Sequence, residues 1–139
     1  MGGLRAGGGG RGVRAAAVGA AVLTVGAGLG VRAATGGGFA KITGDALYTV
    51  LVGTLVVLVA PRVRPVVAAG TALAISWAVE FSQLSDVPAE LSRRSVAARL
   101  VLGSTFDPPD LLWYALGAAL CWALHATAER LRYGRQRAG

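Results

Sequence analysis

Charged residues and cysteine are scarce in this chain, and their scarcity excludes several classes of protein. Only 15% of the residues are charged while 54% are hydrophobic, a balance outside the range of soluble globular domains. The one cysteine, Cys121, excludes an internal disulfide and a cysteine-rich metal cage. The net charge of +7 comes without interleaved aromatic and basic residues, so we expect no nucleic-acid partner. We expect membrane lipids as partners, with anionic headgroups contacting the basic residues at the cytoplasmic face.

Four apolar blocks are long enough to cross a bilayer, since about 20 helical residues span the hydrocarbon core. They predict an all-α fold, an antiparallel four-helix bundle integral to the membrane. The predicted spans are about 14–31, 43–60, 66–84 and 108–128. Between the third and fourth spans, the polar segment predicts a short interfacial helix over residues 88–102.

Two polar motifs are typical of helix starts. Thr43 with Asp45 combines a capping hydroxyl with an acid in the first turn. Asp107 followed by Pro108 combines a capping carboxylate with a proline in the first turn. We therefore expect the second and fourth spans to begin at these motifs.

The two ends of the chain are expected to lie outside the transmembrane domain of residues 13–130. Residues 1–12, rich in Gly and Arg, predict a disordered cytoplasmic tail, and residues 131–139 predict a basic cytoplasmic tail. A second interpretation of the first span is a cleaved secretory signal peptide, because a basic start and an apolar stretch precede Ala33 and Ala34. The apolar stretch is longer than in most signal peptides, and both interpretations stay open.

The distribution of charge predicts the orientation of the bundle in the cell membrane, because cytoplasmic segments carry an excess of Lys and Arg. With the N-terminus inside, nine basic residues lie in inner segments: Arg5, Arg11, Arg14, Arg62, Arg64, Arg130, Arg132, Arg135 and Arg137. Five lie in outer segments: Arg32, Lys41, Arg93, Arg94 and Arg99. Both termini are therefore predicted to be cytoplasmic, and most of the acidic residues then fall at the outer face.

A polar cluster is predicted at that outer face. Glu80 lies inside a span, where an ionised carboxylate needs a partner. The small residues Ser76, Ala72 and Ala68 precede it at intervals of four and would direct it toward another helix. Arg93, Arg94 and Arg99 are within reach of the converging acids, and among them we favour Arg99 because a guanidinium pairs with carboxylates bidentately. The candidate ligand-binding residues are Asp45, Tyr48, Glu80, Gln83, Arg99, Asp110 and Tyr114.

Each of these residues also has a purely structural interpretation. Asp45, Asp107 and Asp110 are suited to capping or to the first turn of a helix. Glu80 and Gln83 are suited to hydrogen bonds that only specify helix packing, and the tyrosines to packing or interface anchoring. A metal site is not expected, because His125 and Cys121 form a pair without a third ligand. We expect no cofactor.

Four motifs carry a family resemblance. They are, in chain order, Lys41-Ile-Thr-Gly-Asp-Ala-Leu-Tyr48, Glu80-Phe-Ser-Gln83, Leu102-Gly-Ser-Thr-Phe-Asp107 and Asp110-Leu-Leu-Trp-Tyr-Ala-Leu-Gly117. The chain thereby resembles the bacterial membrane family called domain of unknown function 2809. It is also similar to the VanZ-like membrane proteins, although Tyr114 stands where those proteins typically carry Asn. The resemblance implies a four-span bacterial membrane protein without an established activity, and supports Asp45, Glu80, Gln83 and Asp110 as positions to test.

Three hypotheses for the function follow. The first is an outer-leaflet pocket for a lipid or cell-envelope headgroup. The second is a membrane-embedded enzyme acting on envelope lipids, with Glu80 or Asp110 as general base, but no serine is paired with a histidine. The third is a structural or assembly subunit, in which Gly26-x-x-x-Gly30 and the series Ala115, Ala119 and Ala123 contact a second copy or another membrane protein. A transporter is disfavoured because no inverted repeat is recognisable.

Overall fold

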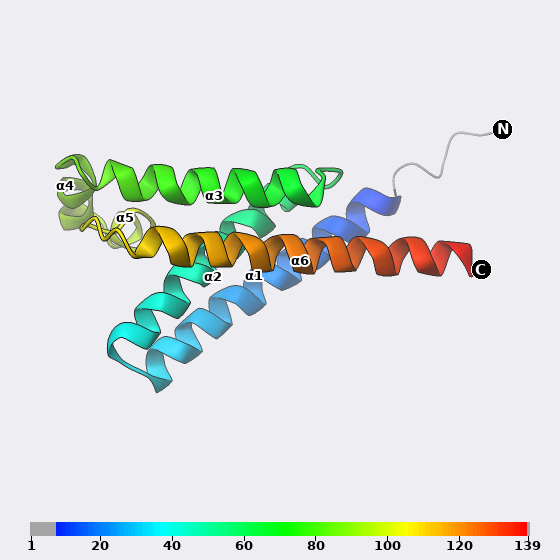
Figure 1. The fold of residues 1–139 in the computed structure, drawn as a ribbon, viewed down its shortest axis with the longest axis horizontal. Coiled ribbons are helices and arrows are strands. Elements are labelled where there is room, and N and C mark those ends of the chain that lie inside the picture. Colours follow the sequence, from blue (N-terminus) through cyan, green and yellow to red (C-terminus); the bar gives the residue numbers. More distant parts are fainter. Residues whose placement is uncertain (1–7, 139) are drawn as a thin grey trace.

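The computed structural model describes residues 8–138, and within that range it contains helices and connecting turns but no strand (Figure 1). The helices are α1 (Gly8–Ala34), α2 (Gly37–Val59), α3 (Pro65–Ser82), α4 (Val87–Arg94), α5 (Val96–Leu102) and α6 (Asp110–Arg137). Four of the described helices, α1, α2, α3 and α6, are long and apolar enough to cross a membrane. The predicted all-α bundle of four membrane helices is therefore confirmed.

The four long helices are arranged as two antiparallel pairs. In Figure 1, the pair α1 and α2 crosses diagonally against the pair α3 and α6. Helix α2 packs against each of the other three long helices, so it is the centre of the bundle. The α1–α2 turn, α4, α5 and the start of α6 are at one end, here called the pocket end. The α2–α3 turn and the last turns of α6 are at the opposite end, here called the basic end.

Small residues allow the helices to approach closely. On α3, Ala68, Ala72 and Ser76 are completely buried, which confirms the predicted small-residue stripe below Glu80. The Ser76 hydroxyl lies 2.9 Å from the Thr49 hydroxyl of α2, and this hydrogen bond joins the two helices inside the apolar core. On α6, a Cβ atom at Gly117 would overlap the carbonyl oxygen of Ala46, so only glycine permits this contact with α2.

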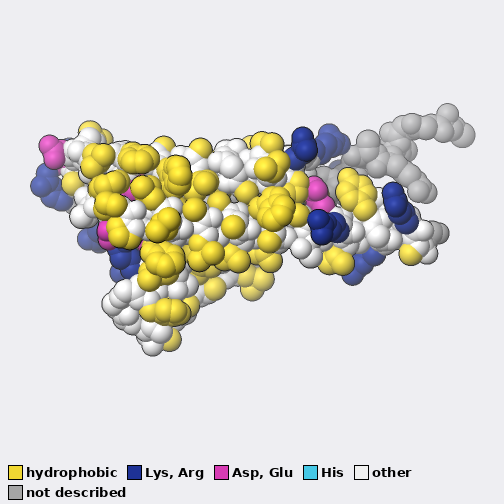
Figure 2. Space-filling view, viewed as in Figure 1, with side chains coloured by type: hydrophobic (Ala, Val, Ile, Leu, Met, Phe, Trp, Pro, Cys, Tyr) yellow, Lys and Arg dark blue, Asp and Glu magenta, His cyan; other side chains and the backbone are white. Residues whose placement is uncertain are grey.

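The surface between the two ends of the bundle is apolar. Figure 2 shows hydrophobic side chains spread over α3 and α6, with Lys and Arg gathered toward the ends. Large side chains such as Leu112, Leu124 and Val59 are exposed along this surface, as expected of residues that face acyl chains. Gly26 and Gly30 have open space around them, so the small-residue surface of α1 is not used for packing within the described bundle.

Both terminal helices extend further than the sequence indicates. Helix α1 begins at Gly8, so residues 8–12 of the predicted disordered tail are helical, while residues 1–7 lie outside the described residues. Helix α6 continues to Arg137, through most of the predicted basic tail. Once a helix is nucleated, each added residue contributes a further hydrogen bond, so packed spans propagate into weakly helical flanks.

The interfacial segment is two helices rather than the one predicted. Ser95 adopts an extended conformation with φ of −143° and ψ of 127°, which separates α4 from α5. Its hydroxyl accepts a 3.3 Å hydrogen bond from the Ala98 N–H and caps the start of α5. Serine favours this position because its side chain replaces a missing backbone acceptor.

The predicted helix starts are also displaced. Helix α2 begins at Gly37, ahead of the Thr43 motif. Helix α6 begins at Asp110, and Asp107 does not cap it: the N-cap is Pro109, without a side-chain hydrogen bond. The Asp107 carboxylate instead forms an ion pair with Lys41, so it does not accept a hydrogen bond from the first backbone N–H groups of α6.

Candidate functional site

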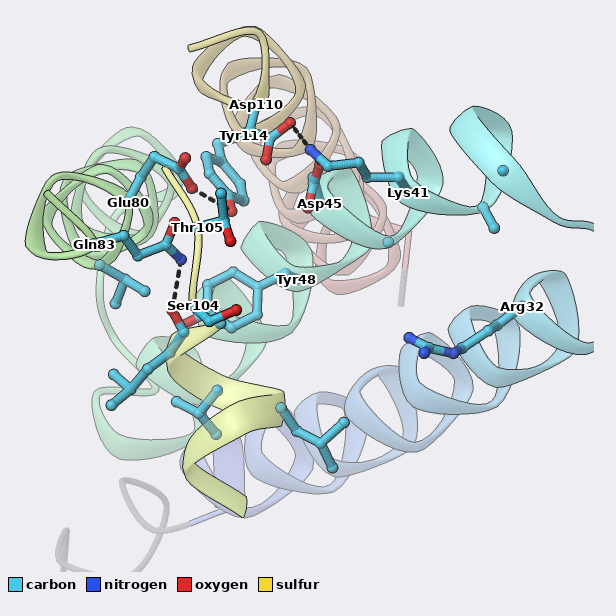
Figure 3. A pocket seen from close by; sticks show the side chains of 18 of the residues that line it. Arg32, Lys41, Asp45, Tyr48, Glu80, Gln83, Ser104, Thr105, Asp110 and Tyr114 are labelled. Carbon is cyan, nitrogen blue, oxygen red and sulfur yellow. Dashed lines mark hydrogen bonds and ion pairs between the residues drawn. The ribbon is translucent and has the colours of Figure 1, made fainter. Parts of the chain in front are cut away.

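A polar pocket with a volume of about 660 Å³ lies at the pocket end of the bundle (Figure 3). Its walls come from the last turn of α1, the first turns of α2 and α6, the end of α3, and α5 with the loop that follows it. Pockets of this size accommodate small molecules or the polar parts of larger ones. The fold therefore brings together polar side chains that are far apart in the sequence.

Lys41 is the centre of the charged side chains in this pocket. It lies on the first turns of α2, and its Nζ is 3.1 Å from Oδ2 of Asp107 and 3.6 Å from Oδ2 of Asp45. It also donates a hydrogen bond to Oδ1 of Asp110, at the start of α6 (Figure 3). One ammonium group thus holds three carboxylates from two helices and a loop, which joins α2 to the start of α6.

Glu80 is the most deeply buried carboxylate, with 1% of the residue exposed. Its Oε1 accepts a 2.6 Å hydrogen bond from the backbone N–H of Asp107, and its Oε2 accepts a 3.1 Å hydrogen bond from the hydroxyl of Tyr114. These two donors satisfy both oxygens of a group that is otherwise expensive to bury in a membrane protein. Glu80 thereby fixes the end of α3 to the loop before α6.

Gln83 holds the loop that closes the pocket. Its Nε2 donates a 2.6 Å hydrogen bond to the carbonyl of Leu102, whereas its Oε1 is buried without a hydrogen-bond donor among the described residues. Gly103 follows with a φ of +63°, a conformation that favours glycine. From α4, the hydroxyl of Ser92 donates a 2.7 Å hydrogen bond to the Gly103 carbonyl. The loop backbone is therefore anchored from two helices.

Two tyrosines form the aromatic part of the wall. The rings of Tyr48 on α2 and Tyr114 on α6 have centroids 6.1 Å apart and are tilted by 59°. Tyr114 is buried and Tyr48 is half-buried. This tilted ring contact adds to the packing of α2 against α6.

Six of the seven residues proposed from the sequence line this pocket. They are Asp45, Tyr48, Glu80, Gln83, Asp110 and Tyr114. The seventh, Arg99, is exposed, is not part of the lining and forms no ion pair within residues 8–138. The lining residues of α5 are Leu100, Val101 and Leu102, which leaves Arg99 outside. The predicted cation is therefore replaced by Lys41.

Sequence reasoning also left out Lys41 and Arg32 as site residues. Lys41 and Asp45 are separated by four residues on one helix, a spacing at which opposite charges meet, so this partnership was recognisable from the sequence. Arg32 lies in the last turn of α1 and lines the pocket through the α1–α2 packing. No local spacing relates it to the other lining residues.

A second cavity of about 300 Å³ lies between α1, α2 and α6 and has a mainly apolar lining. It contains Cys121 and His125, the pair considered above as metal ligands. His125 Nε2 is 3.7 Å from Oε1 of Glu129, which lies one turn further along α6. Among the described residues, no group of three metal-ligating side chains is present.

Comparison with known proteins adds a family and no function. No curated protein and no solved structure matches the chain significantly. A family model matches residues 35–118, a range that includes every lining residue named above except Arg32. The similarity to VanZ-like proteins stays a prediction. Because the match covers more than half of the sequence, the chain belongs to the family described as Protein of unknown function (DUF2809).

Proposed function

We propose that this protein is a membrane-embedded binding protein, whose polar pocket accommodates the headgroup of a lipid or of a cell-envelope component. The observation that carries this proposal is a polar pocket of about 660 Å³ at the end of helices whose outer surfaces are apolar. An amphiphile has the matching division into a polar head and an apolar tail. Its tail would lie along the exposed side chains of the bundle while its head enters the pocket.

The partners of Glu80 and Asp110 support a binding role over the enzyme hypothesis, which names these two residues as the general base. A general base needs an oxygen that is free to accept a proton from the substrate. Both oxygens of Glu80 already accept hydrogen bonds from Asp107 and Tyr114, and Asp110 is paired with Lys41. These carboxylates are better suited to holding the walls of a site in position.

We also propose that the pocket end faces away from the cytoplasm. The positive-inside tendency supports this orientation. Eight of the described arginines belong to helix ends or turns at the basic end: Arg11, Arg14, Arg62, Arg64, Arg130, Arg132, Arg135 and Arg137. In this orientation they contact anionic headgroups of the cytoplasmic leaflet.

The binding proposal is tested by filling the pocket. Gly44 lines the pocket and has open space around it, so the Gly44→Leu substitution places an apolar side chain there without a backbone clash at Cβ. Gly38→Leu is a matched control on the same helix, since Gly38 also has open space but does not line the pocket. Native mass spectrometry of gently extracted protein should detect co-bound lipid in the wild type and in Gly38→Leu, and much less in Gly44→Leu. Equal lipid retention in all three proteins would contradict the proposal.

The orientation is tested by labelling single cysteines in intact cells. Ala97 is exposed on α5 at the pocket end, and Gln136 is exposed on α6 at the basic end. In a Cys121→Ala background, a membrane-impermeant maleimide should label Ala97→Cys and spare Gln136→Cys until the cells are opened. The reverse pattern would mean that the pocket faces the cytoplasm.

A further inference from the structure

We propose that the pocket selects a zwitterionic headgroup, with a primary ammonium beside Asp45 and a phosphate beside Arg32. This inference rests on the proposed headgroup binding and adds the chemical class of the ligand. It follows from three features of the described residues: a surplus of carboxylates around Lys41, acceptor atoms without donors, and an arginine without an ion pair or hydrogen bond.

The surplus of negative charge lies around Lys41. Three carboxylates, those of Asp45, Asp107 and Asp110, share this one ammonium group. Asp45 has the weakest contact, since its Oδ2 lies 3.6 Å from the Lys41 Nζ and accepts no hydrogen bond within the described chain. Only 18% of the Asp45 side chain is exposed, so water cannot fully replace the missing donor. A second cation in the pocket would balance this charge.

Acceptor atoms in the pocket wall favour a cation that donates hydrogen bonds. Besides Asp45, the Oε1 atom of Gln83 is buried without a donor in the described part of the chain. Both residues line the pocket, so their oxygens belong to groups that a bound ligand would contact. A primary ammonium offers three N–H donors, whereas a quaternary ammonium of the same charge offers none.

The position for an anion is at Arg32. Its side chain extends from α1 toward the interior of the pocket (Figure 3), and it lines the pocket without an ion pair or hydrogen bond in residues 8–138. A guanidinium binds phosphate oxygens with two parallel hydrogen bonds. Lys41 cannot serve this purpose, because its ammonium is already surrounded by carboxylates. An ester of phosphate with a small amino alcohol carries both required charges.

The experiment compares three phospholipids with identical acyl chains, each added to delipidated protein and followed by native mass spectrometry. Phosphatidylethanolamine presents the primary ammonium, phosphatidylcholine the quaternary one, and phosphatidylglycerol hydroxyl groups without a cation. We expect phosphatidylethanolamine to bind at least about tenfold more tightly than the other two lipids, a difference of about 1.4 kcal/mol in binding free energy. Asp45→Asn should abolish the preference over phosphatidylcholine. Arg32→Ala should weaken binding of all three lipids, and Arg99→Ala, at an exposed arginine outside the pocket, should change nothing.

The outcomes separate this inference from the proposed function. Suppose that the three lipids bind equally, or that phosphatidylglycerol is preferred, and that Gly44→Leu abolishes this binding. That result would overturn the selection of a zwitterionic headgroup and leave the proposed headgroup binding intact. Binding that Gly44→Leu does not reduce would overturn both. If Asp45→Asn lowers the melting temperature of the protein, Arg32→Ala and Arg32→Lys decide the question, because Arg32 has no partner in the described fold to lose. Retained binding in Arg32→Ala would contradict the phosphate position.

Discussion

The carboxylate of Glu80 on α3 and the backbone N–H of Asp107, just before α6, are joined by a hydrogen bond of 2.6 Å. The second carboxylate oxygen accepts the hydroxyl of Tyr114 at 3.1 Å. Through these contacts a single buried side chain connects the end of α3 to the beginning of α6. The loop in between carries part of the pocket wall, so the shape of the pocket depends on this carboxylate.

Replacing Glu80 by alanine should destabilise the protein strongly. The buried Tyr114 hydroxyl and the half-buried Asp107 N–H lose their acceptor, and we expect the free energy of unfolding to fall by about 2–5 kcal/mol. Glu80→Gln should lower the free energy of unfolding less than Glu80→Ala does. The amide oxygen still accepts a hydrogen bond from the Asp107 N–H, and the tyrosine hydroxyl can turn to accept one from the amide nitrogen. Denaturant unfolding in mixed micelles measures both losses. If the two variants were equally unstable, the charge of Glu80 rather than its hydrogen bonds would be the stabilising feature.

Gly117 should be intolerant of even one methyl group. A Cβ atom there would overlap the Ala46 carbonyl, so Gly117→Ala must separate α6 from α2, and we expect a loss of about 2–3 kcal/mol in unfolding free energy. Gly134→Ala, on the same helix with open space around it, is the control and should be neutral or stabilising by up to about 1 kcal/mol. Similar unfolding curves for the two variants would contradict the close α2–α6 contact.

Gly103 and Gly37 separate two effects of a glycine substitution. Both have a positive φ, but a Cβ at Gly103 would lie 2.7 Å from Nε2 of Gln83, whereas none of the described atoms lies near a Cβ at Gly37. Gly37→Ala should therefore lower the free energy of unfolding only by the cost of a positive φ at a residue with a side chain, about 1–2 kcal/mol. Gly103→Ala should lose more, about 2–4 kcal/mol, because it also displaces the Gln83 amide from the Leu102 carbonyl. Equal losses in thermal unfolding would mean that the amide moves aside freely.

The ion pairs of Glu90 on α4 should make part of the stability dependent on pH. Hydrogen bonds from Arg93 and then from Arg94 hold the pKa of the Glu90 carboxyl below its usual value. A carboxyl whose pKa is lower in the folded state stabilises the fold above the unfolded pKa, and this contribution is lost as the pH falls through the folded pKa. Melting temperatures of the wild type and of Glu90→Gln should therefore differ slightly at neutral pH and converge below about pH 4. A difference that persisted or grew at acidic pH would contradict this assignment.

The candidate site was partly predictable, because helix period and chain order are local properties. Spacings of three and four residues place Glu80 with Gln83 and Asp110 with Tyr114 on single helix faces. The alternation of antiparallel spans brings the start of α2, the end of α3 and the start of α6 to one end of the bundle. For that reason the acidic residues of three helices were expected together, and the structure has them lining one pocket.

The choice of cation was only partly predictable, because a spacing of four relates Lys41 to Asp45 but no local spacing relates it to Asp107 or Asp110. Arg93, Arg94 and Arg99 are all near the acids in the chain, yet the ion-pair partner of the three aspartates is Lys41. Two of these pairs, those with Asp107 and Asp110, join residues more than sixty positions apart. Such a contact depends on how α6 docks on α2, which follows from the close approach at Gly117.

The membrane helices and the gathering of most acids at one end follow from the sequence, because the length of the apolar blocks, the helical period and the alternating direction of the spans are properties of consecutive residues. Only the packed fold specifies which distant charges meet, where the interfacial segment breaks, and that Arg32 lines the pocket without a partner among residues 8–138. Those features depend on distances of a few ångströms between side chains from different helices, and such distances are defined only when the helices are packed.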